Sequence, residues 1–220
     1  ISPIFKSKRI PYFLNVFKAP IGRKTQNTLD LCIAGLTNPE NKDITKLEQL
    51  LNHIENQGGT VQGKKVKFHI INYYELPKKI RKYESSGLVK SYIDSSSVET
   101  MNVVSKSNFV MVLAKKNSSY HTKQLSGIIP LAISVGTPLI MDKPLAQKYN
   151  AEDISVTYNF SGDYLLNSLE NALNVNYASL VRNVVEFRDA TIAKNKSFFF
   201  RLEKIGTKAP PKSTSRSSPK

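Results

Sequence analysis

The chain has 220 residues, 40% of them hydrophobic, and carries 32 basic against 17 acidic residues, a net charge of +15. This length suffices to bury the core of one ordinary domain, and no uninterrupted apolar run approaches the roughly 18 residues of a membrane span. The single cysteine, Cys32, excludes an intramolecular disulfide, and three scattered histidines predict no zinc site and no other metal site. The composition therefore predicts a soluble globular protein. Without a visible signal peptide, we expect it in the cytoplasm.

Most of the excess positive charge lies at the two ends of the chain. Residues 1–29 hold six bases and no acid, and residues 206–220 hold four bases and no acid. Basic ends attract any polyanion at long range, a nucleic acid or an anionic membrane surface included, without specifying one. A solvated tail explains the same residues, so a nucleic-acid-associated protein stays open on this evidence alone.

Strands and helices are predicted to alternate along the chain. Residues 109–114, Phe-Val-Met-Val-Leu-Ala, form a continuous apolar run that is typical of a strand buried on both faces. The other expected strands are 29–35, 65–73, 88–93, 138–141 and 154–158, and the expected helices are 44–54, 77–84, one around Met101 and Val104, 125–135, 162–173 and 177–193. This alternation predicts an α/β fold, doubly wound and Rossmann-like, with a mainly parallel sheet and a C-terminal helix. Its ligand crevice is expected at the carboxyl ends of the strands.

The expected domain organisation has three parts. Residues 1–28 form a basic N-terminal arm or the remnant of a preceding domain, since the chain begins with Ile. Residues 29–205 form the Rossmann-like domain, and 206–220, rich in Pro, Ser and Lys, form a disordered basic tail.

The most informative segment is 126–140, Ser-Gly-Ile-Ile-Pro-Leu-Ala-Ile-Ser-Val-Gly-Thr-Pro-Leu-Ile. A glycine that enters a helix lets a ligand approach backbone N–H groups, and a helix N-terminus favours negative charge. We therefore expect a phosphate or diphosphate site at Ser126, Gly127, Ile128 and Ile129. Tight helix–strand packing is the alternative explanation for the glycine, and Gly136 and Pro138 are expected only to end the helix and begin the next strand.

This segment resembles a known family. Residues 126–140 are similar to the Phe-Gly-Leu-x-Pro-Leu-Glu-Ala-x-Ala-x-Gly-x-Pro-Val-Ile block of GT-B glycosyltransferases, in the C-terminal half that holds the nucleotide sugar. Residues 33–43, Ile-Ala-Gly-Leu-Thr-Asn-Pro-Glu-Asn-Lys-Asp, are similar to that half's Gly-Arg-Leu-x-x-x-Lys-Gly turn. The strand at 109–114 followed by Asn-Ser-Ser-Tyr matches its apolar strand that ends in Pro-Ser. The resemblance covers about residues 30–173.

The resemblance implies a ligand and roles for particular residues. The donor would be a nucleotide-diphosphate sugar bound without a metal or other cofactor, and the acceptor a saccharide or glycan held by an N-terminal partner domain. Gly35 and Gly127 would let the donor approach the backbone. Lys42 would bind the diphosphate, with Lys123 and Lys143 as substitutes. A loop lysine solvated by water is the alternative for Lys42.

Two departures from the family leave a non-catalytic binding or scaffold protein open as a second function. Neither of the two glutamates that flank the block in retaining members is present, since Lys123 or Gln124 and the run 130–132 stand in their places. The basic residue beside the first glycine is replaced by Leu36. His121 lies just before the block and is expected to pack or to touch the donor, and Asp142 is expected to cap a helix.

Overall fold

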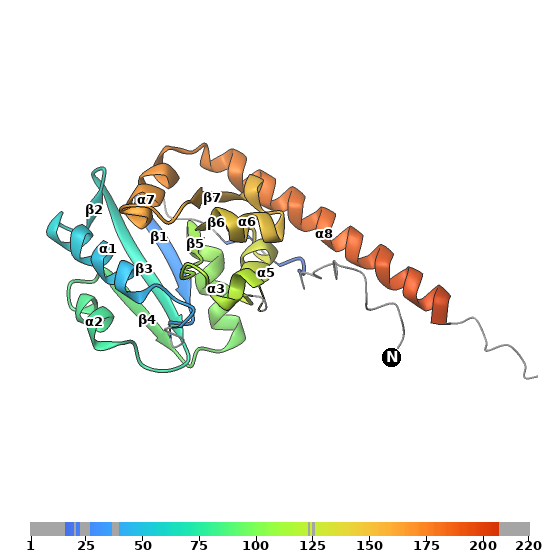
Figure 1. Ribbon diagram of the computed structural model, residues 1–220, viewed down its shortest axis with the longest axis horizontal. Coiled ribbons are helices and arrows are strands. Elements are labelled where there is room, and N and C mark those ends of the chain that lie inside the picture. Colours follow the sequence, from blue (N-terminus) through green and yellow to red (C-terminus); the bar gives the residue numbers. More distant parts are fainter. Residues whose placement is uncertain are drawn as a thin grey trace, which may run out of the picture.

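The computed structural model has a parallel sheet at its centre, and it describes residues 16–19, 21–22, 27–36, 40–122, 124 and 126–206, with side chains described as far as Ser197 (Figure 1). The predictions for most of the N-terminal arm, for Lys123 and for the tail at 207–220 lie outside the described residues.

The sheet has the strand order of a doubly wound domain. The parallel strands follow the order β4 (Val89–Ile93), β3 (Lys64–Asn72), β1 (Thr28–Ala34), β5 (Phe109–Met111), β6 (Leu139–Asp142) and β7 (Ser155–Tyr158). A two-residue strand, β2 (Thr60–Val61), pairs antiparallel with the start of β3. The chain first builds the sheet outward from β1 on one side and then returns to the other side with β5. The topological switch point therefore lies between β1 and β5, and the predicted fold class is confirmed.

Helices cover both faces of this sheet, as Figure 1 shows. The face that carries Leu31 of β1 packs against α1 (Ile44–Asn56), α2 (Lys78–Arg81) and α7 (Tyr164–Asn174). The face that carries Cys32 packs against α3 (Ser97–Lys106), α5 (Ile128–Ser134), α6 (Lys143–Tyr149) and α8 (Tyr177–Gly206). The remaining short helices are α4 (Ser119–Thr122) and the 3-10 turns η2 (Lys82–Glu84) and η3 (Glu152–Ile154).

The amino-acid pattern explains these elements locally. Successive residues of β1 alternate between the two cores, and almost all are buried, so the strand is a nearly continuous apolar run. Helix α1 buries Leu47, Leu50, Leu51 and Ile54 at helical spacing, and its N-cap Asp43 accepts a hydrogen bond from the backbone N–H of Lys46.

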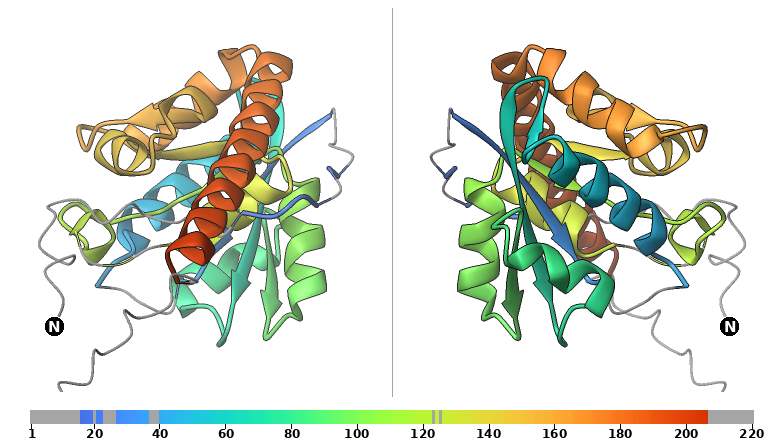
Figure 2. Two further views of the ribbon diagram at one scale, coloured as in Figure 1. Left: turned by 90° about the vertical axis from the view of Figure 1, so that its right-hand side faces the viewer. Right: turned by 90° about the vertical axis from the view of Figure 1, so that its left-hand side faces the viewer.

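Several element boundaries differ from the prediction. Strand β5 ends at Met111, three residues before the end of the apolar run, and α5 begins at Ile128 instead of residue 125. Helix α8 continues to Gly206, and Figure 2 shows it running diagonally across one face of the molecule. For helix α6 only the N-cap at Asp142 was predicted and not its extent, although Asn150 ends it in the left-handed conformation, which is an ordinary boundary signal.

The described part of the N-terminal arm lies against the domain. Val16 and Ala19 are buried, and the N–H of Ala19 donates to the carbonyl oxygen of Ser134 at 3.3 Å. A Cβ placed on Gly22 would lie 2.3 Å from the carbonyl oxygen of Ser105 in α3, so only glycine permits this close approach. Among the described helices, none is both long enough and apolar enough to cross a bilayer.

Candidate functional site

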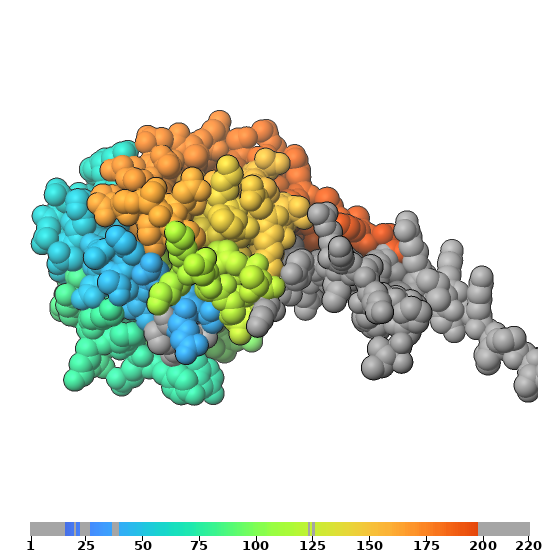
Figure 3. Space-filling model, viewed as in Figure 1, coloured from blue at the N-terminus to red at the C-terminus, as the bar shows by residue number. Residues whose placement is uncertain are grey.

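The carboxyl ends of β1 and β5 place the candidate site at the topological switch point of the sheet. The loop after β1 contains Gly35 and Lys42, and the loop after β5 leads through α4 to Gly127. Figure 3 shows the segments around residues 40–46 (blue), 115–122 (yellow-green) and 158–166 (orange) side by side on one face. In doubly wound domains, ligands bind at this edge.

Gly35 makes the turn after β1 and leaves its outer side open. Its φ of +71° lies in the left-handed region, it is exposed, and a Cβ there would meet nothing within 4 Å. Its N–H donates to the carbonyl oxygen of Ile71 at 2.9 Å, and the N–H of Leu36 donates to Asn72 Oδ1 at 3.0 Å. Both N–H groups therefore donate to groups inside the fold. Gly35 leaves space for a ligand, but it provides no hydrogen-bond donor.

Lys42 is a buried lysine without a carboxylate partner among the described residues. Its residue is 3% exposed, its backbone pairs with that of Ala114 after β5, and its Nζ lies 5.1 Å from the centre of the Tyr120 ring. Burial lowers the pKa of the Lys42 ammonium to about 8. A buried charge without a counter-ion is costly, and such groups concentrate at functional sites.

Asn41, next to Lys42, ties the two loops together. Its Oδ1 accepts hydrogen bonds from the N–H of Ser119 at 3.0 Å and from its hydroxyl at 2.8 Å, and its carbonyl oxygen accepts from the N–H of Lys115 at 2.9 Å. These contacts join residues that lie more than 70 positions apart. The loop that carries Lys42 is therefore held against the loop that leads to Gly127.

The four predicted residues at the start of α5 divide into two kinds. Gly127 is exposed, has a φ of −63°, and has nothing within 4 Å of the position of a Cβ. Ser126 is buried, and its N–H donates to the Tyr149 hydroxyl at 2.8 Å, while the side chains of Ile128 and Ile129 lie in the core. Of these four residues only Gly127 presents an open surface, since the two isoleucines are buried and the N–H of Ile129 donates to the carbonyl oxygen of Ser126 at 3.3 Å.

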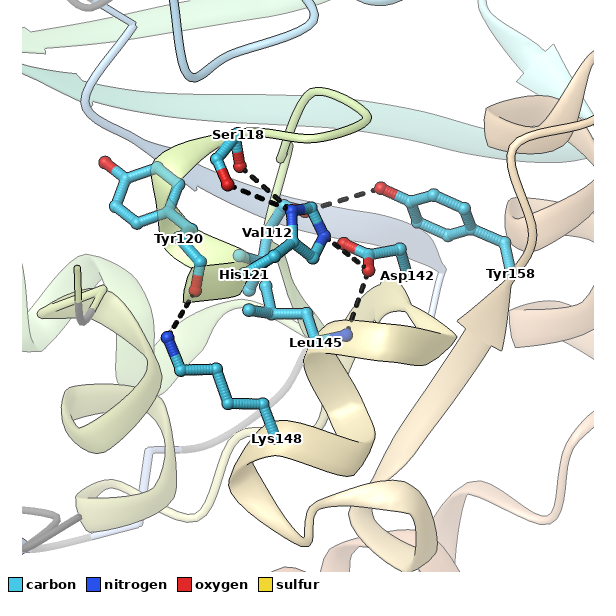
Figure 4. A network of polar contacts seen from close by, with 8 residues as sticks. All are labelled: Val112, Ser118, Tyr120, His121, Asp142, Leu145, Lys148 and Tyr158. Atoms are coloured by element: carbon cyan, nitrogen blue, oxygen red, sulfur yellow. Dashed lines mark hydrogen bonds and ion pairs between the residues drawn. The ribbon is translucent and has the colours of Figure 1, made fainter. Parts of the chain in front are cut away.

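A polar network that was not predicted as a unit lies beside this segment (Figure 4). Nε2 of His121 in α4 is 2.8 Å from Oδ1 of Asp142 at the end of β6, and that oxygen also accepts from the N–H of Leu145 at 2.9 Å. Lys148 of α6 donates to the carbonyl oxygens of Tyr120 and Gln124 at 2.6 and 2.9 Å. These contacts fasten the segment around α4 onto α6. The predicted helix-cap role of Asp142 is confirmed.

Three aromatic rings form the wall of the site beyond β6. Tyr158, Phe160 and Tyr164 contact one another with ring centres 4.9–5.7 Å apart, and Phe160 lies 6.2 Å from the His121 ring. The Tyr164 hydroxyl donates to Asp43 Oδ2 at 2.6 Å. Burial, and next the carboxylate of Asp142, raise the pKa of Tyr158 well above its usual value, so Tyr158 is neutral. The described residues include no group of His, Cys, Asp and Glu arranged for a metal ion.

The strand order and the open corner at its switch point define a Rossmann-like α/β domain. Among solved structures, the chain is similar to trehalose-6-phosphate synthase from Burkholderia multivorans, with a TM-score of 0.51 and 11% identity over 84% of this chain and 45% of that one. It is also similar to the calicheamicin glycosyltransferase CalG4, with a TM-score of 0.53 and 10% identity over 89% of this chain and 47% of that one.

A third similar structure is WaaG, a glycosyltransferase of lipopolysaccharide biosynthesis, with a TM-score of 0.50 and 14% identity over 73% of this chain and 43% of that one. These are glycosyltransferases of the GT-B fold, and the chain has the fold of one half of such a protein. It spans less than half the length of the structures that it matches. No family model and no curated protein sequence matches the chain.

Proposed function

We propose that this chain is the donor-binding half of a glycosyltransferase. It binds a nucleotide-diphosphate sugar at the carboxyl edge of its sheet, and the sugar passes to a saccharide or glycan acceptor held by an N-terminal partner domain. The observation that carries the proposal is Lys42, a buried ammonium group at the switch point with no carboxylate partner among the described residues.

The electrostatics of Lys42 favour an anionic ligand. Other buried charged side chains of the domain have partners: Asp142 faces His121 and Arg188 contacts Asp189. A diphosphate would supply a negatively charged partner for the Lys42 ammonium. Its negative charge increases as it leaves the sugar. Fixed positive charge at that point accelerates transfer.

Space for the diphosphate is provided by the two glycines. Gly35 and Gly127 are both exposed, and a Cβ on either residue would meet no neighbour. The contacts of Asn41 with Ser119 hold the loop after β1 against the loop after β5. The proposal therefore rests on open space at the two glycines together with a buried cation in the loop after β1.

The proposal is tested by binding of UDP and GDP to the full chain, measured by calorimetry in the wild type and in Lys42→Met. We expect one of these nucleotides to bind in the micromolar range and the substitution to weaken it by about tenfold to a hundredfold, as for a charge-assisted contact. Lys65→Met is the matched control, since Lys65 is exposed at the amino end of β3. The affinity should also fall as the pH rises above about 8, because free Lys42 then loses its proton.

A different result assigns another function. If neither diphosphate binds and DNA binds instead with an affinity that collapses in salt, the chain is a nucleic-acid-associated protein. If the diphosphate binds equally well to Lys42→Met, the proposed site is wrong.

A non-catalytic nucleotide-sugar-binding protein is the second candidate. It is favoured by residues 130–132, which contain no glutamate, whereas retaining GT-B glycosyltransferases have one in the corresponding segment. Leu131 of this segment packs against the core. The test is turnover of a bound nucleotide sugar by the full-length protein: released diphosphate supports the transferase, and unaltered donor supports the binding protein.

A further inference from the structure

Asp142 carries a buried carboxylate oxygen that has no hydrogen-bond partner among the described residues. Its Oδ1 accepts from His121 Nε2 and from the N–H of Leu145, but its Oδ2 has no donor in the described structure. The side chain is fully buried. Leaving a buried charged oxygen unpaired costs as much as breaking a charge-assisted hydrogen bond, so such an atom calls for an explanation.

The neighbouring donors are committed elsewhere. The Tyr164 hydroxyl donates to Asp43 at 2.6 Å, and the Tyr158 hydroxyl points to the carbonyl oxygen of Val112 at 3.5 Å. Figure 4 shows that carbonyl, His121 and Tyr158 around the carboxylate. The missing donor must therefore come from outside the described residues.

The charge at this point determines which chemical group fits. The negative charge of Asp142, which also contributes to the raised pKa of Tyr158, would repel a phosphate, so the partner is a group that donates an O–H or N–H. Phe160, which is only partly buried, adds an aromatic surface whose ring lies against His121 and Tyr164. A hydroxyl donor joined to an apolar ring face is the chemistry of a sugar.

His121 lies over the carboxylate and controls access to it. Its side chain is 14% exposed, whereas that of Asp142 is not exposed at all. Apart from its bond to Asp142, the ring has two long contacts of Nδ1 with Ser118, to the hydroxyl and to the carbonyl oxygen, each 3.3 Å, and an edge contact with Phe160. It belongs to α4, a single helical turn. A rotation of this ring therefore opens a path to Asp142.

We infer that Asp142 Oδ2 accepts a hydrogen bond from a hydroxyl group of the sugar carried by the donor, and that His121 covers this oxygen until the sugar enters. This subsite rests on the proposed function, and it lies at the ends of β6 and β7 beside the diphosphate corner. It distinguishes a nucleotide sugar from the bare nucleoside diphosphate, which has no group to place there.

The experiment compares each sugar nucleotide with its parent diphosphate on the full chain: UDP-glucose with UDP, and GDP-mannose with GDP. Calorimetry measures both affinities in the wild type and in Asp142→Asn. The readout is the affinity for the sugar nucleotide divided by the affinity for its parent diphosphate. The amide oxygen can keep the hydrogen bond from Leu145, and the NH₂ group, a donor, then stands opposite the sugar hydroxyl. We expect the ratio to fall by about tenfold or more, since a hydrogen bond to a charged group is lost.

Asp43→Asn is the matched control. Asp43 also caps a helix beside the site, but both of its oxygens accept hydrogen bonds from protein groups, so its substitution should leave the ratio unchanged. If Asp142→Asn does not fold, Asp142→Ser keeps a capping oxygen and removes the second one. His121→Ala should keep the ratio or raise it, because the cover is removed.

The outcomes separate this inference from the proposed function. Diphosphate binding with a lowered ratio in Asp142→Asn supports the subsite. Diphosphate binding with an unchanged ratio overturns it and leaves the proposed function intact. Failure of the wild type to bind any diphosphate overturns both.

Discussion

At the scale of single residues, Lys42 lowers the stability of the free protein while it serves the proposed function. A group whose pKa falls from 10.5 to about 8 on folding is unfavourable in its charged form inside the protein. That difference corresponds to about 3 kcal/mol of unfolding free energy at neutral pH. A residue kept at such a cost is explained by a ligand that carries the opposite charge.

Lys42→Met is therefore expected to stabilise the free protein by roughly 1–3 kcal/mol at pH 7. The folded-state pKa is lower than the unfolded one, so the penalty is present below about pH 8 and disappears as the pH rises toward 10.5. The advantage of the variant should shrink over that same range. Urea unfolding of both proteins at pH 7, 9 and 10 measures it. A variant that is less stable than the wild type at pH 7 would contradict the assignment.

At the scale of elements, the site is built where helices begin after parallel strands. Asp142 ends β6 and caps α6, and Gly127 begins α5. Helix α5 has only seven residues, so its position depends on anchors such as the hydroxyl of Tyr149 on the N–H of Ser126. Packing by neighbouring elements therefore sets the geometry of the open corner more than helix propensity does.

Gly127→Val tests this corner. The φ of −63° suits valine, and no atom lies within 4 Å of the added Cβ, so the melting temperature should change little. The side chain would block the approach of a phosphate to the backbone, and the affinity for the diphosphate should fall by about tenfold or more. Calorimetry and thermal unfolding measure the two effects, with Gly127→Ala as the smaller step. An unaltered affinity would exclude the start of α5 from the site.

At the scale of the whole molecule, the two ends of the described chain meet the same face. Residues 16–19 and 21–22 contact α5 and α3, and α8 packs against α5 through the buried Val184 and Arg188. Figure 1 shows the later turns of α8 extending beyond the body. The described residues of the N-terminal segment and helix α8 together cover the core that contains Cys32.

Gly22→Ala measures how much this N-terminal contact stabilises the protein. The new Cβ would lie 2.3 Å from the carbonyl oxygen of Ser105, so the arm must shift, at a cost of roughly 1–3 kcal/mol. Chemical denaturation is the measurement, and Gly127→Ala, where there is space, is the control. Equal stability of Gly22→Ala and the wild type would show that the arm contributes nothing to the fold.

Much of the fold was predictable because its signals are local. The apolar run at 109–114 and the helical spacing of Leu47, Leu50 and Leu51 each act within a few residues. The boundaries of β5 and α5 were wrong because they depend on pairing and on anchors from other segments. The extent of α6 was missed, although its cap at Asp142 was predicted, since its seven residues show too little periodicity.

The sequence by itself determined the alternation of strands and helices and the turn glycines, since backbone conformation depends on neighbouring residues, and Lys42 became a candidate ligand through the resemblance of residues 33–43 to the GT-B turn. Only the tertiary structure decided that Lys42 is buried with no carboxylate partner in the described part of the chain, that Asn41 joins two loops, and that His121 meets Asp142. Those facts depend on contacts between residues 21 to 78 positions apart, and burial and unpaired charge exist only once such segments pack together.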